Sequence, residues 1–229
     1  MNEMTKNQIT DTHAAIFEKM TEFFLKTNET LNLTAIKDID GVILKHIVDS
    51  SAIIPYIKDG DKVADIGCGG GFPTFPIAIL RGGVSLFSVD SVTKKVEYVK
   101  RCAEHLGLQN ISVSNERAEV LGKDPKYREN FDIVTARAVG RLNLICELCL
   151  PLVKVGSYFI AMKSQTTDEE IEEASVAIST LGGKLEKVER YVLTDGNETI
   201  DRTLVIIKKE GKTPPKYPRN NSQISKKPL

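Results

Sequence analysis

The sequence predicts an α/β fold: a mostly parallel sheet with helices on its faces. Three observations predict it. Short apolar segments alternate with longer amphipathic segments from residue 62 onward. The first apolar segment runs straight into a glycine cluster at residues 67–71, and the second ends in Asp90. Such alternation is typical of parallel sheets, and a glycine-rich turn from strand to helix is typical of folds that bind nucleotides there.

Length and composition indicate a soluble globular protein. The chain has 229 residues, of which 41% are hydrophobic and 27% charged, and its formal net charge is zero. The sequence has neither a secretory signal nor an apolar run of membrane-spanning length, so we expect no membrane partner. The four cysteines lie in predicted core segments, which favours reduced thiols and a cytoplasmic location. Cys146 and Cys149 are predicted to lie on a buried helix face, and no metal site is expected.

The expected elements follow the chain in order. Residues 5–57 should be helical with a break at 32–34, and the second helical stretch should span 39–57. Strands are expected at 62–67, 84–90, 111–115, 131–136, 154–162, 184–193 and 200–208. Helices are expected at 72–81, 92–107, 140–150 and 167–181. The turn signal Thr194-Asp195-Gly196-Asn197 joins the last two strands into a hairpin, which predicts a seven-stranded sheet with the last strand antiparallel.

Three segments are predicted from this pattern. Residues 1–60 form an N-terminal helical extension, residues 61–209 form the α/β core, and residues 210–229 form a basic tail that contains prolines. The tail has two open interpretations. It is either a solvated, irregular C-terminus, or a basic strap that binds RNA phosphates. Its prolines are expected to prevent a helix.

The glycine loop selects the ligand class. Gly67 and Gly69 fit a dinucleotide fingerprint, but Phe72 stands where that fingerprint has its third glycine. Asp65 would repel a pyrophosphate yet can hold an ammonium group. Gly71 allows the backbone to approach a ligand closely. A cofactor with an amino acid at one end and a ribose at the other fits these residues, which indicates S-adenosylmethionine.

Further residues complete a predicted cofactor site. Asp90 ends the second strand, where an acid can accept hydrogen bonds from both ribose hydroxyls. Ser91 follows it; the alternative is that Asp90 and Ser91 cap the next helix. Ala118 and Glu119 follow the third strand and are expected to border the adenine. A surface role for Glu119 is the open alternative.

The end of the fourth strand indicates the acceptor. The segment Thr135-Ala136-Arg137-Ala138 lacks the Asn/Asp-Pro-Pro pattern of enzymes that methylate exocyclic amines. The cysteine that 5-methylcytosine enzymes need is also missing there. A ring nitrogen such as guanine N7 has its own lone pair and needs alignment rather than a base. Arg137 and Lys163 are the candidate catalytic residues that position the target nucleotide, and Arg202 is expected to extend a basic rim.

Taken together, the motifs resemble one family over nearly the whole chain: the ribosomal RNA small-subunit methyltransferase G family, also called glucose-inhibited division protein B. The resemblance is carried by ordered motifs at residues 32–36, 45–50, 65–73, 89–96, 117–119, 135–139, 147–152, 216–219 and 226–229. It departs from the family at Thr74 and Ser164, where the family often has small residues or glycine, and at residues 220–224. None of these departures is expected to touch the cofactor acids.

The resemblance implies a Rossmann-like class I S-adenosylmethionine-dependent methyltransferase that modifies N7 of one guanosine in 16S ribosomal RNA near the decoding centre. It implies cofactor contacts at Gly67, Phe72, Asp90, Ser91, Ala118, Glu119 and Arg137. The predicted RNA-binding residues are Arg202, Lys216, Arg219, Lys226 and Lys227, the partner is 16S RNA or the small ribosomal subunit, and the protein is expected to be a monomer. A small-molecule methyltransferase and a non-catalytic ribosome-assembly factor remain the alternatives, and an NAD oxidoreductase is the weakest.

Overall fold

The computed structural model describes residues 10–164, 168–194, 196 and 198–229. Residues 5–9 of the predicted N-terminal helix lie outside the described residues, as do Asp195 and Asn197 of the predicted turn.

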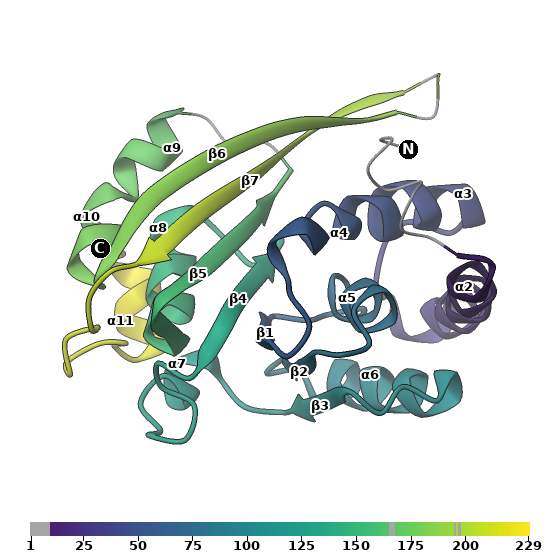
Figure 1. Ribbon diagram of the computed structural model, residues 1–229, viewed down its shortest axis with the longest axis horizontal. Coiled ribbons are helices and arrows are strands. Elements are labelled where there is room, and N and C mark those ends of the chain that lie inside the picture. Colours follow the sequence, from purple (N-terminus) through teal and green to yellow (C-terminus); the bar gives the residue numbers. More distant parts are fainter. Residues whose placement is uncertain (1–9, 165–167, 195, 197) are drawn as a thin grey trace.

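The described residues form one seven-stranded sheet with the strand order β3-β2-β1-β4-β5-β7-β6. Five neighbouring strands run parallel, and β7 lies antiparallel between β5 and β6. The predicted sheet, with its last strand inserted antiparallel, is confirmed (Figure 1). The strands are β1 (Lys62–Ile66), β2 (Ser85–Val89), β3 (Ile111–Ser114), β4 (Phe131–Arg137), β5 (Val153–Lys163), β6 (Gly183–Thr194) and β7 (Thr199–Lys209).

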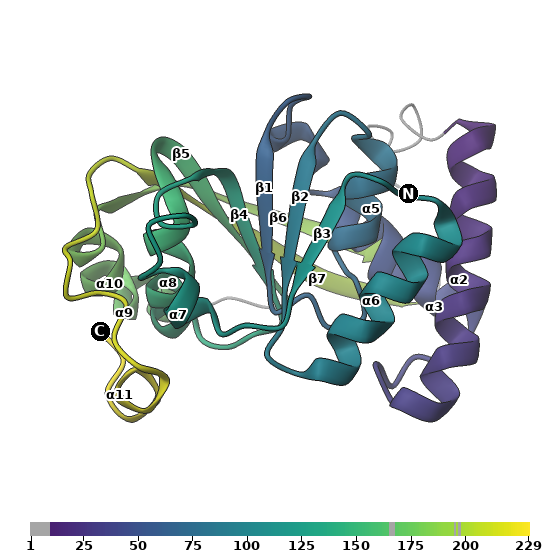
Figure 2. The same ribbon diagram turned by 90° about the horizontal axis from the view of Figure 1, so that it is seen from below.

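Helices cover both faces of the sheet (Figure 2). Since neighbouring residues of a strand point to opposite faces, Val63 packs with α2, α5 and α6, whereas Ala64 packs with α8 and α10. The core helices are α5 (Thr74–Leu80), α6 (Thr93–Leu106), α7 (Ala118–Leu121), α8 (Leu142–Cys149) with the 3-10 turn η3 (Leu150–Leu152), α9 (Asp168–Glu173) and α10 (Ser175–Thr180). The single helix expected at 167–181 is therefore two helices, and α7 was not predicted.

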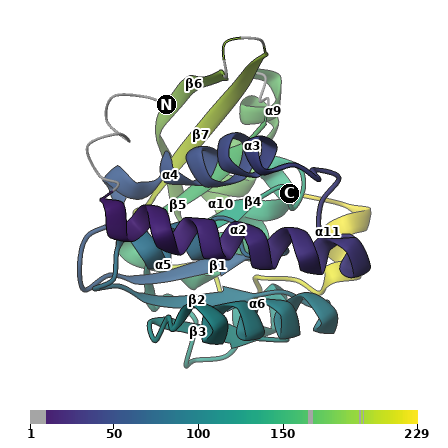
Figure 3. The ribbon, with the colours of Figure 1, turned by 90° about the vertical axis from the view of Figure 1, so that its right-hand side faces the viewer.

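The N-terminal extension packs onto the core as its outer layer (Figure 3). The helix α2 (Asp11–Leu31) begins at the capping residue Thr10 and ends at Asn32, whose φ of 50° breaks the helix. The single stretch expected over 39–57 is instead a series of short elements: α3 (Ile39–Val42), the π-helix η1 (Ile43–Val48), α4 (Asp49–Ser51) and the 3-10 turn η2 (Ile54–Tyr56). Phe24 of α2 contacts the ring of Phe72, so the extension reaches the glycine loop.

The C-terminal tail is ordered against the core, and it contains the helix α11 (Asn221–Lys226). The expectation that prolines prevent a helix is wrong, because α11 lies between Pro218 and Pro228 and is started by the capping residue Asn220. Tyr217 and Ile224 are buried in the same hydrophobic cluster as α8. The division of the chain into three segments, with boundaries after residues 60 and 209, stays a prediction. Residues of all three segments lie in the hydrophobic clusters of the protein.

Candidate functional site

The glycine loop lies where the carboxyl ends of β1 and β2 meet. The backbone nitrogens of Gly67 and Cys68 donate hydrogen bonds of 2.8 and 3.0 Å to the carbonyl of Val89, the last residue of β2. Ligands of open α/β sheets bind at this edge. The fold therefore brings the predicted loop and Asp90 together.

Asp65 lies buried on β1 directly below this loop. Its Oδ2 accepts a 2.6 Å hydrogen bond from the hydroxyl of Thr74, whereas its Oδ1 has no hydrogen-bond partner within the described ranges. Burial raises the pKa of Asp65 to about 6. The expectation that Thr74 leaves the cofactor acids untouched is wrong, because its hydroxyl directly contacts one of them.

Asp90, directly after β2, holds the glycine loop by a hydrogen bond. Its Oδ2 accepts a 3.0 Å hydrogen bond from the nitrogen of Gly69, and its Oδ1 accepts a 2.9 Å bond from the nitrogen of Val92. Each carboxylate oxygen has a second lone pair, so these contacts leave room for hydroxyl donors. The contact with Val92 also shows that Asp90 organises the entry to α6, while Ser91 is exposed.

Two glycines of the loop occupy positions that a larger residue could not. Gly67 has a φ of +76°, and a Cβ atom there would come 2.6 Å from Val139 Cγ2. Gly71 has a φ of +85°, and a Cβ atom there would collide with the ring of Phe75. Positive φ favours glycine, so both residues are needed for this loop shape.

Phe72 forms the floor of an aromatic group beside the loop. Its ring stacks on the His46 imidazole with centroids 4.6 Å apart, and the Arg137 guanidinium lies 5.6 Å from its centroid. On the other side of the edge, Ala118 is buried at the start of α7 and Glu119 pairs with Arg117 at 3.8 Å. Both follow β3, as the predicted adenine position requires.

Arg137 ends β4 and is held by the N-terminal extension. Its Nη1 lies 3.1 Å from the carbonyl of Lys45 and 3.0 Å from Asp49 Oδ2, and its Nη2 lies 3.0 Å from His46 Nδ1. An arginine only donates, so His46 Nδ1 accepts and its Nε2 carries the proton toward the Thr34 hydroxyl, 3.2 Å away. Burial, followed by the nearby Arg137 charge, lowers the pKa of His46 to about 3.

The predicted basic rim is largely neutralised by acids. Lys163 lies near this edge, but its Nζ donates to the carbonyl of Gly140 at 2.9 Å and pairs with Glu170 at 2.6 Å. Arg202 is the fourth residue of β7, and its Nε lies 3.2 Å from Asp49 Oδ1. The structure thus joins Arg137 and Arg202 through Asp49 and pairs Lys163 separately.

The sequence analysis did not single out Asp49, Tyr191 or Glu170. The hydroxyl of Tyr191 donates a 2.8 Å hydrogen bond to Asp49 Oδ1 across 142 positions of sequence. A signal was available, because His46 and Asp49 are three residues apart, a spacing that places both on one face of a helix. Their common face meets Arg137.

The predicted RNA-binding residues of the tail lie on a different part of the molecule. β7 is antiparallel, so its last residue, Lys209, pairs with Gly183 at the edge opposite the glycine loop, and the tail starts there. Lys216, Lys226 and Lys227 are exposed. Arg219 is held by Glu147 of α8, with Nη2 2.5 Å from Oε2.

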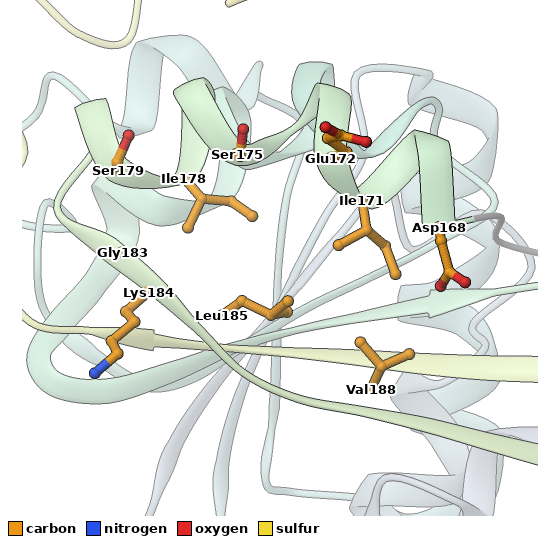
Figure 4. A pocket seen from close by; sticks show the side chains of 10 residues that line it. All are labelled: Asp168, Ile171, Glu172, Ser175, Ile178, Ser179, Gly183, Lys184, Leu185 and Val188. Atoms are coloured by element: carbon orange, nitrogen blue, oxygen red, sulfur yellow. The ribbon is translucent and has the colours of Figure 1, made fainter.

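A separate groove of about 510 Å³ lies between α9–α10 and the first half of β6 (Figure 4). Ile171, Ile178, Leu185 and Val188 make its walls largely apolar, and it contains none of the predicted site residues.

Among the described residues, no helix is long and apolar enough to cross a membrane and no cluster of His, Cys, Asp or Glu is arranged to hold a metal ion. All four cysteines are buried and free.

Comparison with known proteins identifies the family. The family model described as rRNA small subunit methyltransferase G (GidB) matches residues 13–199. The chain belongs to this family. Ribosomal RNA small subunit methyltransferase G of Geobacillus sp. (strain WCH70) is 42% identical over 217 residues, which cover 94% of this chain and 90% of the relative. The protein of the same name from Staphylococcus carnosus (strain TM300) is 43% identical over 216 residues, covering 93% and 89%.

A solved structure supports the fold of this methyltransferase G family member. The precorrin-6y C5,15-methyltransferase from Geobacter metallireducens GS-15 superposes with a TM-score of 0.53 at 15% identity, covering 69% of this chain and 85% of that one. At this identity the likeness concerns the fold alone. The predicted family, the Rossmann-like fold, the methyltransferase class and S-adenosylmethionine as cofactor are confirmed.

The site residues fit that cofactor. The Asp65 oxygen that lacks a protein partner among the described residues suits an ammonium donor, and Asp90 can accept hydroxyl donors. The glycine loop lies beside Asp65 and Asp90 and, because glycine has no side chain, offers its backbone to a ligand there. The assignment of individual contacts to Gly67, Gly69, Gly71, Phe72, Ser91, Ala118 and Glu119 stays a prediction.

Proposed function

We propose that this protein transfers the methyl group of S-adenosylmethionine to N7 of one guanosine in 16S ribosomal RNA, near the decoding centre. Membership of the methyltransferase G family supports the RNA substrate. The main support for the cofactor site is the buried Asp65. Its Oδ1 has no hydrogen-bond partner in the described residues, and the residue lies beside the glycine loop. A buried carboxylate oxygen left without a donor is costly in a folded protein, unless a ligand supplies that donor.

Each predicted residue then has a role toward the cofactor, and Arg137 would face either the cofactor carboxylate or the target nucleotide. Asp65 would bind its ammonium group, and Gly67, Gly69, Gly71 and Phe72 would enclose the methionine end. Asp90, assisted by Ser91, would accept hydrogen bonds from the ribose hydroxyls, and Ala118 with Glu119 would border the adenine. The cofactor, when bound, supplies an electrophilic methyl group attached to a sulfonium.

The protein's contribution to the reaction is alignment. Guanine N7 carries its own lone pair, so no side chain has to remove a proton before attack. Orientation of two reactants can lower a barrier by on the order of 7–11 kcal/mol. Extrusion of a base from its stack costs a few kcal/mol, and contacts from Arg137, Lys163 and Arg202 to the target nucleotide would offset that cost.

The setting of this activity is also part of the proposal. The partner is 16S RNA or the small ribosomal subunit, the location is the cytoplasm, and the working form is a monomer. The buried free thiols support a reducing compartment.

The test uses labelled S-adenosylmethionine and small-subunit RNA that lacks its modifications, supplied both naked and as ribosomal particles. The RNA is digested and the labelled nucleoside is identified by mass spectrometry. The expected result is one 7-methylguanosine in the decoding region. Absence of label in every RNA, despite measurable cofactor binding, would favour a small-molecule methyltransferase or a non-catalytic assembly factor instead.

A further inference from the structure

Three groups of the N-terminal extension hold the Arg137 guanidinium. They are the carbonyl of Lys45, the carboxylate of Asp49 and the imidazole of His46, all on η1 or at the start of α4. The arginine itself belongs to the end of β4, far along the sequence from all three. Its side chain is only 15% exposed. The orientation of this arginine is therefore set by a segment outside the α/β core.

The hydrogen bonds within the protein do not use every donor of Arg137. A guanidinium has five N–H donors. Two on Nη1 and one on Nη2 are used by the extension. The Nε–H and the second Nη2–H have no hydrogen-bond acceptor in the part of the chain that the structure describes. A guanidinium with two free donors suits an oxygen-bearing acceptor such as a carboxylate, a phosphate or the O6 edge of guanine.

Asp49 is the centre of this arrangement. It is buried, and its Oδ2 pairs with Arg137 at 3.0 Å while its Oδ1 accepts from Tyr191 at 2.8 Å and lies 3.2 Å from Arg202 Nε. These partners come from β4, β6 and β7. One carboxylate between two guanidiniums leaves one positive charge, which an anionic ligand would balance.

We propose that Asp49 is a positioning residue: it fixes Arg137 so that its two free N–H groups face an oxygen acceptor at the carboxyl edge of the sheet. This inference rests on the proposed function and deepens it. His46 assists, because its neutral ring accepts from Nη2 and stacks on Phe72 of the glycine loop. In this proposal Asp49 acts through the guanidiniums that it holds, those of Arg137 and Arg202, and the part of its effect that passes through Arg137 is the part tested.

A double-mutant cycle tests that dependence. The variants are Asp49→Asn, Arg137→Lys and the two combined. The readouts are kcat and KM for methylation, together with dissociation constants for S-adenosylhomocysteine and for unmodified 16S RNA. We expect Asp49→Asn to weaken at least one of these by on the order of ten- to a hundredfold in the parent protein, since misplacement by about 1 Å can cost that much. In the Arg137→Lys background the same change should matter less than about twofold.

The readout that moves identifies the acceptor. Weaker binding of S-adenosylhomocysteine with unchanged RNA affinity identifies the cofactor carboxylate, and the converse identifies the RNA. An equal loss from Asp49→Asn in both backgrounds would overturn the proposal, because the residue would then act independently of Arg137. The two dissociation constants need no turnover, so failure of the proposed reaction is separable from failure of this inference.

A matched control separates positioning from stability. Tyr191→Phe removes a hydrogen bond to the same carboxylate without touching Arg137. It should lower the melting temperature yet leave kcat/KM within about twofold. A loss of kcat/KM as large as that of Asp49→Asn would contradict a specific role for Asp49. If Asp49→Asn does not fold, His46→Gln replaces it in the cycle with the same expected dependence on Arg137.

Discussion

The Arg219 guanidinium spans both carboxylate oxygens of Glu147, with Nε 2.9 Å from Oε1 and Nη2 2.5 Å from Oε2. The backbone nitrogen of Arg219 adds a further 2.8 Å bond to Oε1. Glu147 is fully buried on α8, and pairing with it raises the pKa of Arg219. This ion pair anchors the C-terminal tail to the core.

Loss of this anchor should destabilise the protein. Arg219→Ala leaves a buried carboxylate without its charged partner, for which we expect a fall of about 3 kcal/mol in the free energy of unfolding. Chemical denaturation measures it. The exposed Lys227→Ala is the control and should stay within about 0.5 kcal/mol of the parent. Equal stability of both variants would show that Arg219 does not anchor the tail.

The exposed lysines of the tail, rather than Arg219, remain available for RNA. Replacing Lys216, Lys226 and Lys227 by alanine should weaken RNA binding. The slope of log affinity against log salt should fall by roughly 0.7–0.9 for each RNA phosphate that the variant no longer neutralises. Filter binding at several salt concentrations measures this slope. Lys184→Ala, on the first half of β6, is the control. An unchanged slope in the triple variant would rule out RNA binding by the tail.

Asp65 should lower the stability of the cofactor-free protein at neutral pH. Because burial raises its pKa from 3.8 to about 6, its contribution to stability is full below about pH 3.8 and is lost as the pH rises through 6. Asp65→Asn does not titrate. Above pH 6 we therefore expect the Asn variant to be more stable than the parent by at most about 3 kcal/mol, since each unit of pKa shift is worth about 1.4 kcal/mol. We expect the same variant to lose binding of S-adenosylmethionine.

The difference in stability between Asp65→Asn and the parent is measured from unfolding curves between pH 4.5 and 8, recorded without cofactor. The exposed Asp201→Asn serves as the control and should track the parent across the range. A constant offset between Asp65→Asn and the parent at every pH would mean that Asp65 does not titrate in this window.

Local patterns predicted the sheet well, since every strand lies within two residues of its expected bounds. Alternating apolar residues and turn signals act over short distances, as does the glycine loop. The helix α11 carried a local signal that was missed: Asn220 and Gln223 form a capping box, which outweighed the prolines on either side. The break at Ala174 had no such signal.

The contacts of the site residues were not predictable in the same way. Asp49 meets Arg137 and Tyr191 only because β4 and the β6–β7 hairpin bring distant positions to one edge. Arg219 similarly finds Glu147 across 72 positions. Lys163, Arg202 and Arg219 are basic residues that the sequence presents without partners, and each is paired with an acid in the fold, since a half-buried cation requires a partner.

The hydrogen bond from Thr74 to Asp65 should control both stability and cofactor affinity. Thr74→Val keeps the shape but removes the hydroxyl that donates to Oδ2 of a buried carboxylate. We expect a loss of about 1–3 kcal/mol at pH 7.5 and weaker binding of S-adenosylmethionine, because the pKa of Asp65 rises further and less of the carboxyl is ionised. The loss of stability should be smaller at pH 5, where the parent carboxyl is itself largely protonated. Thr74→Ser retains the hydroxyl and should match the parent in stability and in cofactor affinity. If the Val variant matches the Ser variant in both quantities at both pH values, the Thr74 hydrogen bond does not tune Asp65.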